Sequence, residues 1–455
     1  MLIVDAEVAG RTGVGVRVAD GRVVASGAGL RPVGGESVLE AHGGALLPGL
    51  HDHHVHLRAM AGALASVPVG PPVVRDRSGL VAALLSASAG LSAGEWVRAV
   101  GYHESVAGPL TRVELDAVVA DRPVRVQHRS GVLWMLNSLA LQAVDAAGSG
   151  LSGVERDDLG RPTGRLFRLD SWLASRLPRV AMSLAAVGDR AAAAGITGFT
   201  EATSDLTQSD VDFLASGGLP QRVHCMAPPG VVSDRLPLGP VKVLLDDSSL
   251  PSVGVLAARF YAAHTAGRPV AVHCMTVVEL VATLSALAEA GSVPGDRIEH
   301  GAVIPADLIP RLRSLVVVTQ PGFIAERGDT YLAEVDGRDI ADLWRLRSLL
   351  DAGVPVAGST DAPFGHFDPW AAIAAATSRR TTSGVVVGPD ERLDPERALG
   401  LFLGHASAPA RPRAVEVGAP ADLCLLAVPL AEGLRILDAT MVAATVVAGR
   451  VVHSN

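Results

Sequence analysis

The chain has 455 residues, of which 49% are hydrophobic, and its formal net charge is −8 at pH 7. This length suits one large domain with an accessory domain, and the lack of a basic block argues against nucleic acid or an anionic membrane surface as the main partner. Because no signal-like start and no uninterrupted apolar run of about 18 residues occurs, we expect a cytoplasmic protein without membrane contact.

Residues 1–45 show the pattern of short β-strands separated by turns. Asp20-Gly21 lies between two alternating apolar runs, which is a strong hairpin signal. Residues 412–455 show the same pattern of short strands, with a turn at Ala448-Gly449. Because each segment is too small to fold alone, we predict that 1–45 and 412–455 pair into one small β-sandwich domain.

The next segment, Leu46–Leu57, reads LLPGLHDHHVHL. Side chains alternate between the two faces of a β-strand, so His54 and His56 point the same way while Val55 points to the other side. Two imidazoles on one face can bind one divalent metal ion. Because the chain has fourteen histidines, this pair alone does not distinguish a metal site from ordinary surface or core histidines.

Residues 58–184 are too many for one loop and must carry structure of their own. The segment includes WVRAVGYHES and DRPVRVQHRSGVLWMLNSLAL. We predict that it is an insertion after the first strand and that it covers the mouth of the barrel that the following strands indicate.

Strands and helices alternate along the remainder of the chain. Seven strand candidates follow the first one: 195–202, 221–226, 241–245, 269–274, 296–301, 315–320 and 354–360. Helices are predicted at 208–216, 252–266, 276–290, 305–313, 339–352, 369–380 and 395–403. Eight strands with intervening helices predict an α/β fold, a (β/α)8 TIM barrel over residues 46–411, with its active site at the carboxyl ends of the strands.

Polar side chains of the metal-binding kind recur at the ends of these predicted strands, where a barrel brings them together. Taken singly, a histidine at such a position is more often a buried core residue whose ring nitrogens are hydrogen-bonded. Taken as a set, five nitrogen or oxygen ligands at successive strand ends predict a metal site built from His54, His56, His273, His300 and Asp361, and Lys242 lies in the fourth predicted strand of the same series.

Lys242 is the only lysine, since the chain has 39 lysines and arginines together and 38 of them are arginine. A position that keeps lysine in such a chain needs something that arginine cannot supply, such as an amine that loses its proton when buried. Drift in an arginine-rich composition is the other explanation.

The chain resembles the amidohydrolase superfamily, and within it amidohydrolase family 3, the group of N-substituted formamide deformylases and N-acyl amino-acid hydrolases. The resemblance covers almost the whole chain and rests on PGLHDHHVHL, GITGFTEA, VKVLLDDSS, VAVHC, RIEHG, VTQPGF, GSTDAPFGHFDPW, GAPADLCLL and TVVAGRVV.

The resemblance implies a role for each of these residues. His54 and His56 would bind the more buried of two metal ions, and His273 and His300 the more exposed one. Lys242, as its carboxylate adduct with CO₂, would bridge both ions, and Asp361 would bind the buried ion and transfer protons. Zn²⁺ is the first expectation, although manganese, iron and nickel suit the same ligands.

The insertion departs from the family pattern. The family has a histidine five residues before the Asn137-Ser138 pair, where this chain has Val132, and His128 lies nearby but out of register. Substrate choice is therefore expected to differ from that of characterised members. Candidate substrate-binding residues are His128, Arg129, His224 and His366.

The predicted function is hydrolysis of a carbon–nitrogen bond, other than a peptide bond, in a small linear or cyclic amide by a metal-bound hydroxide. One alternative is a mononuclear deaminase of an aminated ring, although the Glu expected three residues after His273 is replaced by Thr276, and the nearest acid is Glu279. A second alternative is an inactive relative that serves as a binding protein. The expected partner is a small-molecule substrate, and homodimer formation is left open.

Overall fold

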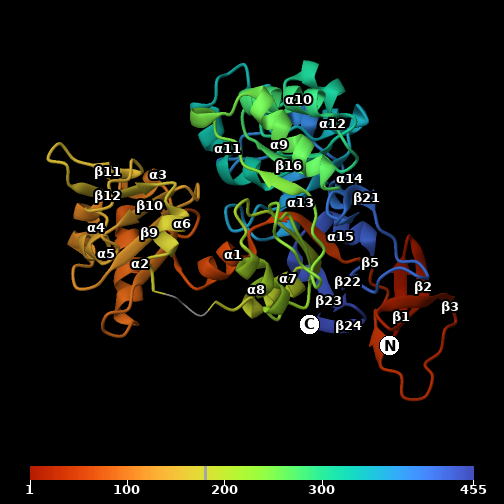
Figure 1. Ribbon diagram of the computed structural model, residues 1–455. Helices are drawn as coiled ribbons and strands as arrows, with labels where there is room; N and C mark the ends of the chain where they lie inside the picture. Colours follow the sequence, from red (N-terminus) through yellow and green to blue (C-terminus); the bar gives the residue numbers. More distant parts are fainter. Residues whose placement is uncertain (179–181) are drawn as a thin grey trace. The chain divides into compact units, whose positions relative to one another are not determined.

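The computed structural model describes residues 1–178 and 182–455. It divides into two compact units, of which the first combines Met1–Leu57 with Leu184–Asn455 and the second is Arg58–Ser183 (Figure 1). The expectation that residues 58–184 cover a barrel mouth stays a prediction.

Parallel strands build the centre of the first unit. One sheet has the order β14-β13-β6, from β6 (Leu50–Val55), β13 (Ile196–Glu201) and β14 (Arg222–Cys225). A second sheet runs in chain order through β15 (Val241–Val243), β16 (Val270–Cys274), β17 (Arg297–His300), β18 (Val316–Thr319) and β19 (Val356–Gly358). Most of these residues are buried, as is typical of parallel strands that are covered on both faces.

The segment predicted as the first strand is divided between two sheets. Leu46–Pro48 forms β5, which pairs with β22 (Leu423–Leu426) of the C-terminal region, and only Leu50–Val55 pairs with β13. Gly49 lies at the division, and a Cβ there would come within 2.1 Å of the Thr197 side chain. The close approach of β13 therefore requires glycine at this point.

Helices connect the parallel strands. The described α-helices of this part are α7 (Ala185–Ala193), α8 (Gln208–Ser216), α9 (Val253–Thr265), α10 (Val277–Ala290), α11 (Gly322–Glu334), α12 (Arg347–Asp351), α13 (Pro369–Ser378) and α14 (Pro395–Gly400). Short 3₁₀ helices are η1 (Asp247–Ser249), η2 (Ala306–Leu312), η3 (Ile340–Asp342) and η4 (Pro389–Glu391).

Three helices differ from the sequence prediction. Residues 305–313 form 3₁₀ helix η2 rather than an α-helix, and Pro310 inside it has no N–H to donate. The predicted helix 339–352 is broken into η3 and α12, because Trp344 has a φ of 49° and its N–H bonds to the Ala302 carbonyl. Helix α11, whose sequence contains two unfavourable glycines, was not predicted.

Two antiparallel sheets come from the two ends of the chain. The first has the order β3-β2-β1-β4, with β1 (Leu2–Val8), β2 (Arg11–Ala19), β3 (Arg22–Ala28) and β4 (Val38–Glu40). The second has the order β24-β23-β22-β5, with β23 (Val442–Val447) and β24 (Arg450–Ser454). One hydrophobic cluster contains Val16 and Val18 of the first sheet and Leu423 and Val446 of the second, so the two sheets share a core.

The connection to the second of these sheets contains a two-stranded ribbon and a helix. The ribbon consists of β20 (Gly404–His405) and β21 (Ala408–Pro412), and α15 (Leu430–Ile436) and 3₁₀ helix η5 (Ala439–Met441) lie between β22 and β23.

The second unit contains one mixed sheet in the order β11-β12-β10-β9-β8-β7. Its strands are β7 (Val67–Pro68), β8 (Val97–Tyr102), β9 (Val124–His128), β10 (Leu133–Leu136), β11 (Val154–Arg156) and β12 (Pro162–Phe167). Helices in this region are α1 (Leu57–Leu64), α2 (Arg77–Ala89), α3 (Glu104–Ala107), α4 (Arg112–Val118), α5 (Ser138–Ala143) and α6 (Asp170–Ala174). Its own cores include Leu84, Val126 and Leu166.

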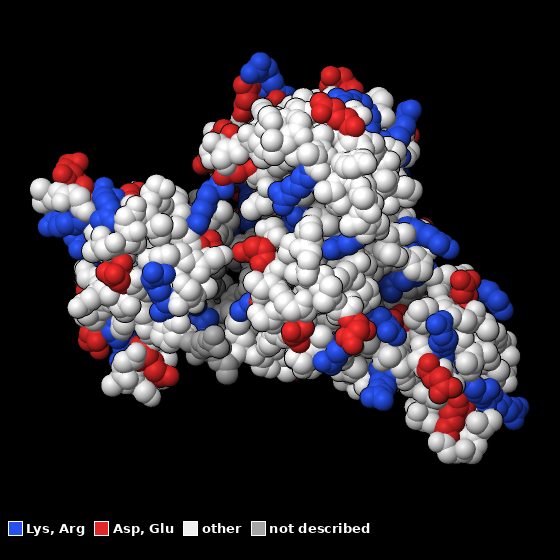
Figure 2. All heavy atoms as spheres, in the orientation of Figure 1, with Lys and Arg blue, Asp and Glu red and all other residues white. Residues whose placement is uncertain are grey.

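Basic and acidic side chains are interspersed over the face of the molecule that Figure 2 shows. None of the helices formed by residues 1–178 and 182–455 is both long enough and apolar enough to span a bilayer.

We predict that Arg379→Met lowers the free energy of unfolding by about 3 kcal/mol, because three buried carbonyl groups would lose their donor. The Arg379 side chain is 1% exposed and donates to the carbonyls of Leu343, Trp344 and Val387 at 2.7–2.9 Å. Denaturant unfolding followed by circular dichroism measures the change. The neighbouring Arg380 is exposed and bonds only to Gly384, so Arg380→Met serves as the control. Equal stability of the two variants would contradict the prediction.

Candidate metal centre

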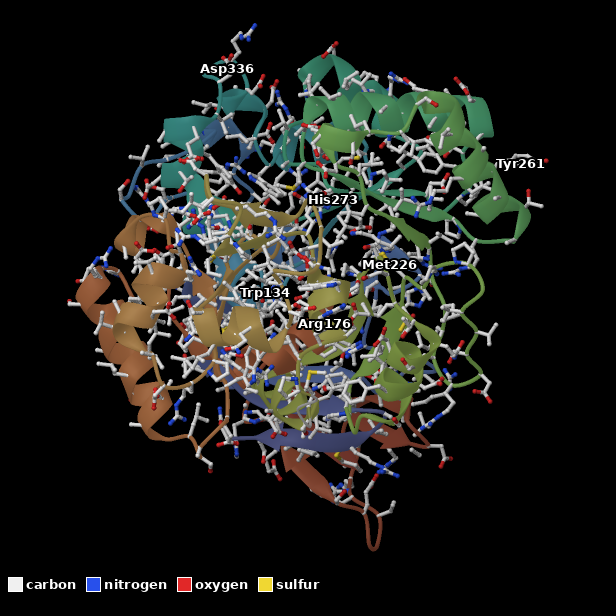
Figure 3. The ribbon with its side chains drawn as sticks, turned by 60° about the vertical axis from the view of Figure 1, so that its left-hand side comes forward. Trp134, Arg176, Met226, Tyr261, His273 and Asp336 are labelled. Carbon is white, nitrogen blue, oxygen red and sulfur yellow. The ribbon has the colours of Figure 1, made fainter. Side chains whose placement is uncertain are left out.

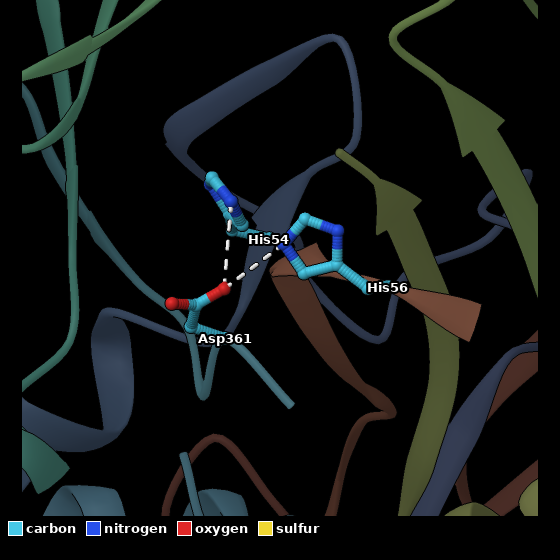
Figure 4. Close-up of side chains that lie close together, drawn as sticks. All are labelled: His54, His56 and Asp361. Atoms are coloured by element: carbon cyan, nitrogen blue, oxygen red, sulfur yellow. Dashed lines mark ion pairs between the residues drawn. The ribbon is translucent and has the colours of Figure 1, made fainter. Parts of the chain in front are cut away.

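Three potential metal ligands meet where strands β6 and β19 end (Figure 4). Asp361 Oδ1 lies 3.2 Å from His56 Nε2 and 3.6 Å from His54 Nε2. The backbone fixes this arrangement, because the Asp361 N–H donates to the His54 carbonyl and the His56 N–H donates to the Ala362 carbonyl. The three side chains therefore converge on one point at the carboxyl end of the parallel strands.

The other three predicted ligands extend this group. Lys242 Nζ lies 3.3 Å from His54 Nε2. The ring centres of His54 and His300 are 4.8 Å apart, and those of His300 and His273 are 4.5 Å apart. In Figure 3, His273 lies in the interior, whereas Tyr261 and Asp336 project from the periphery. The structure thus brings all six predicted residues into one continuous cluster.

A hydrogen-bond partner outside the cluster holds each of three ligand rings. His54 Nδ1 bonds to the Glu299 carboxylate, and His300 Nδ1 lies 2.8 Å from Gln320 Oε1. Both partners accept, so each Nδ1 carries the proton and each Nε2 keeps a lone pair. His56 Nδ1 lies 3.0 Å from Thr203 Oγ1, which suits the same tautomer. This is the arrangement that metal-binding histidines need.

Buried charges support these partners. Arg297 is 2% exposed and pairs with Glu299, which is fully buried, and it also donates to the His53 carbonyl. Asp52 accepts hydrogen bonds from the Thr360 N–H at 3.0 Å and from the Thr360 hydroxyl at 2.5 Å. Asp52 therefore connects β6 to the segment that carries Asp361.

Burial determines the charge of the cluster. Desolvation lowers the pKa values of His54 and His300 well below the usual value for histidine, so both rings are neutral near pH 7. Desolvation also lowers the pKa of Lys242 to about 8 and raises that of Asp52 to about 7. The imidazoles are thus in the form that binds a metal.

The residues fit a divalent cation. Asp361 Oδ1 is buried and has no hydrogen-bond partner among the described residues. An unpaired carboxylate oxygen beside imidazole lone pairs is costly to bury, and a cation that all of them bind removes the cost. Nitrogen and oxygen donors of this kind suit zinc and its neighbours.

The predicted substrate residues lie in different places. His128 and Arg129 belong to the second unit, where His103, Glu104 and His128 form another group that could hold a cation. Arg129 bonds to His103 at 2.8 Å and Arg165 lies 3.9 Å from Glu104, and these guanidinium charges oppose a cation there.

The other two candidates belong to the first unit. His366 follows Asp361 in the loop after β19, and its N–H donates to Glu326 Oε1 at 3.1 Å. His224 lies in the lining of a cavity together with His51.

Sequence reasoning missed the residues that support the ligands, namely Glu299, Gln320 and Thr203. Glu299 immediately precedes His300 in RIEHG, and Gln320 ends the predicted strand 315–320. A charged residue inside a buried strand was the available signal at Glu299, because such a group requires a partner.

Comparisons with known proteins identify similar chains. The sequence profile of the amidohydrolase family matches residues 37–453. An N-substituted formamide deformylase of Arthrobacter pascens is 26% identical, covering 86% of this chain and 84% of that protein. Amidohydrolase YtcJ of Bacillus subtilis is 23% identical, covering 76% of this chain and 75% of the relative.

A solved structure shares the architecture. A metal-dependent hydrolase from Pyrococcus horikoshii superimposes with a TM-score of 0.75 at 18% identity, covering 99% of both chains. This likeness shows an α/β fold of the TIM-barrel type.

We predict that Glu299→Gln weakens metal binding by about 10–100-fold, because a neutral amide is a poorer acceptor for the His54 ring N–H. Titration with Zn²⁺ against a competing chelator measures the affinity. Glu289→Gln, at an exposed position at the end of α10, is the matched control. A folded Glu299→Gln variant that binds zinc as tightly as the control would show that His54 does not need this partner.

Proposed function

The chain belongs to the amidohydrolase family, and we propose that it hydrolyses a carbon–nitrogen bond, other than a peptide bond, in a small linear or cyclic amide. One observation carries the proposal. His54, His56 and Asp361 converge where β6 and β19 end, and Lys242, His273 and His300 continue the same cluster.

We assign the metal ligands from this cluster. His54, His56 and Asp361 would hold one divalent ion, with His273 and His300 available for a second. Neutral imidazoles and an unpaired, buried carboxylate oxygen support this assignment. Zn²⁺ is the first choice for this ligand set.

When bound, the metal lowers the pKa of the attacking water and polarises the substrate carbonyl. Asp361 would also accept the proton that this water loses. The protonated carboxyl group would then donate to the departing nitrogen, so Asp361 acts first as general base and then as general acid.

Lys242 would act as a carboxylate. Its amine is 3% exposed, and burial lowers its pKa to about 8, so a neutral fraction is present near neutral pH. The nitrogen lone pair would attack the carbon of CO₂ and the nitrogen would lose a proton, which leaves a carbamate. The adduct carries the negative charge that two divalent ions require between them.

The family relative that acts on N-substituted formamides suggests linear amides as the first substrates to test. Deamination of an aminated ring has less support. Thr276 stands where a ring-protonating Glu is expected, and Glu279 accepts from the N–H groups of Met275 and Thr276 at the start of α10. The Glu279 carboxylate is thus committed to the helix end.

For the fold, we propose that the three-stranded and five-stranded parallel sheets close into one eight-stranded barrel, and that the two terminal sheets form a sandwich. The hydrogen bond from the Asp361 N–H to the His54 carbonyl links β6, at one edge of the three-stranded sheet, to the segment after β19, at one edge of the five-stranded sheet. A bridge between Cys225 of β14 and Leu238, which precedes β15, links the other two edges. The core shared by the terminal sheets supports the sandwich.

We predict activity on amides in a substrate panel. The zinc-loaded chain should release amine from N-formyl or N-acyl amines, or open hydantoins, and should not release ammonia from aminated purines or pyrimidines. Chromatography of the products and an ammonia assay measure the two reactions. Ammonia release without amide cleavage would favour the deaminase instead.

We predict that Lys242→Arg loses most of its bound metal and nearly all activity, because arginine stays protonated and places a fixed positive charge beside the ligands. Metal analysis and turnover of an amide from the panel measure both effects. Lys242→Ala should regain part of its activity when short carboxylic acids are added. Because Lys242 is the only lysine, mass spectrometry under non-denaturing conditions has one side chain on which to find the CO₂ adduct. A Lys242→Arg variant with full metal content and unchanged turnover would refute the bridging role.

A further inference from the structure

A cavity of about 440 Å³ lies at the other end of the β6 strand from the candidate ligands. The first residues of β6, β13 and β14 line it, including His51, Thr197 and Arg222, and residues 405–422 complete the wall. His51 is the second residue of β6, whereas His54 and His56 lie at and beyond its carboxyl end. The cavity is therefore separate from the proposed active site.

Two glycines make room for the imidazoles of this cavity. A Cβ on Gly198 would come within 2.5 Å of His51 Nδ1, and a Cβ on Gly239 within 2.2 Å of His224 Nε2. Both imidazoles are mostly buried, and desolvation lowers the pKa of His51 well below its usual value and that of His224 to about 4. The rings are neutral at pH 7, so the positive charge of the cavity comes from arginine.

Three guanidinium groups and two carboxylates line the cavity. Asp422 is already committed, because its Oδ2 pairs with Arg222 Nε at 2.6 Å and its Oδ1 accepts from the Ala448 N–H at 2.7 Å. The Glu416 side chain is exposed and makes no hydrogen bond or ion pair within residues 1–178 and 182–455. Arg411 and Arg413 are thus left without a bonded carboxylate.

Arg413 has a fixed position in this wall. Its Nε lies 2.9 Å from the Gly404 carbonyl, and its Nη2 donates to the Gly49 carbonyl. Burial lowers the pKa of Arg413 to about 10, but the group stays protonated at pH 7. Carbonyl oxygens orient the guanidinium without neutralising it, and Nη1 has no hydrogen-bond partner among the described residues.

We propose that this cavity binds a small oxyanion, either free phosphate or the phosphate group of a small monoester, between Arg411 and Arg413. A rigid, partly desolvated guanidinium that bonds only to carbonyl groups favours a phosphate oxygen, and Arg411 supplies a second guanidinium from the rim. Two guanidinium charges attract a dianion more strongly than a monoanion such as chloride, and Glu416 is the carboxylate against which the ligand must compete.

Calorimetric titration of the full-length, metal-loaded chain tests the proposal. Inorganic phosphate and phenyl phosphate are the probes, at an ionic strength held constant with sodium chloride. We expect one site per chain, and an affinity about tenfold weaker in Arg411→Gln, equivalent to about 1.4 kcal/mol. Because Arg411 is exposed and makes no hydrogen bond in the described part of the chain, this variant should fold normally.

The controls separate this site from the metal cluster and from surface charge. Arg11→Gln removes an exposed arginine of β2 outside the cavity and should bind phosphate as the unaltered chain does. Arg411→Lys, which keeps the charge, should bind phosphate more tightly than Arg411→Gln and less tightly than Arg11→Gln. Binding of both probes would identify a monoester as an acceptable ligand, and binding of phosphate alone would identify the free anion. No saturable binding by the unaltered chain, or equal affinity in Arg411→Gln, would overturn the proposal.

Discussion

The rest of the candidate centre depends on the buried carboxylate of Glu299. It contacts Arg297 on one side and the His54 ring on the other, and none of the three side chains is more than 2% exposed. Such a charge is stable in the interior only while it is paired, and here the pairing also sets the His54 tautomer. Arg297 in turn holds the His53 carbonyl, so one ion pair orients both the ligand ring and the strand that carries it.

Strand β6 connects two different polar regions. His51, its second residue, lies in the arginine-lined cavity, and the candidate ligands His54 and His56 lie at and just beyond its carboxyl end. Between them Asp52 and His53 are fully buried. A parallel strand that is covered on both faces is normally apolar, so buried polar side chains there need partners. Asp52 has one in Thr360, after β19, whereas neither ring nitrogen of His53 has a hydrogen-bond partner among the described residues.

The clustering of the six candidate residues could be predicted because polar side chains at successive strand ends are visible along one chain. His273 and His300 each end an apolar run, and alternation placed His54 with His56. The supporting contacts could not be predicted, since strand order alone does not show which polar side chain after a neighbouring strand, such as Gln320 or Thr203, reaches each ring. The prediction of one helix over residues 339–352 was wrong because the long-range hydrogen bond from the Trp344 N–H to the Ala302 carbonyl overrode the local helix propensity.

The backbone at two candidate ligands is itself unusual. His300 has a φ of 69° and Asp361 a φ of 57°, in the left-handed region where a side chain with a Cβ costs about 1–2 kcal/mol. Glycine would relieve that cost at either position but would remove the ligand. Selection for stability alone would therefore favour losing these side chains. Local strain of this kind is typical of functional sites, and the proposed metal centre would hold it in two dihedral angles.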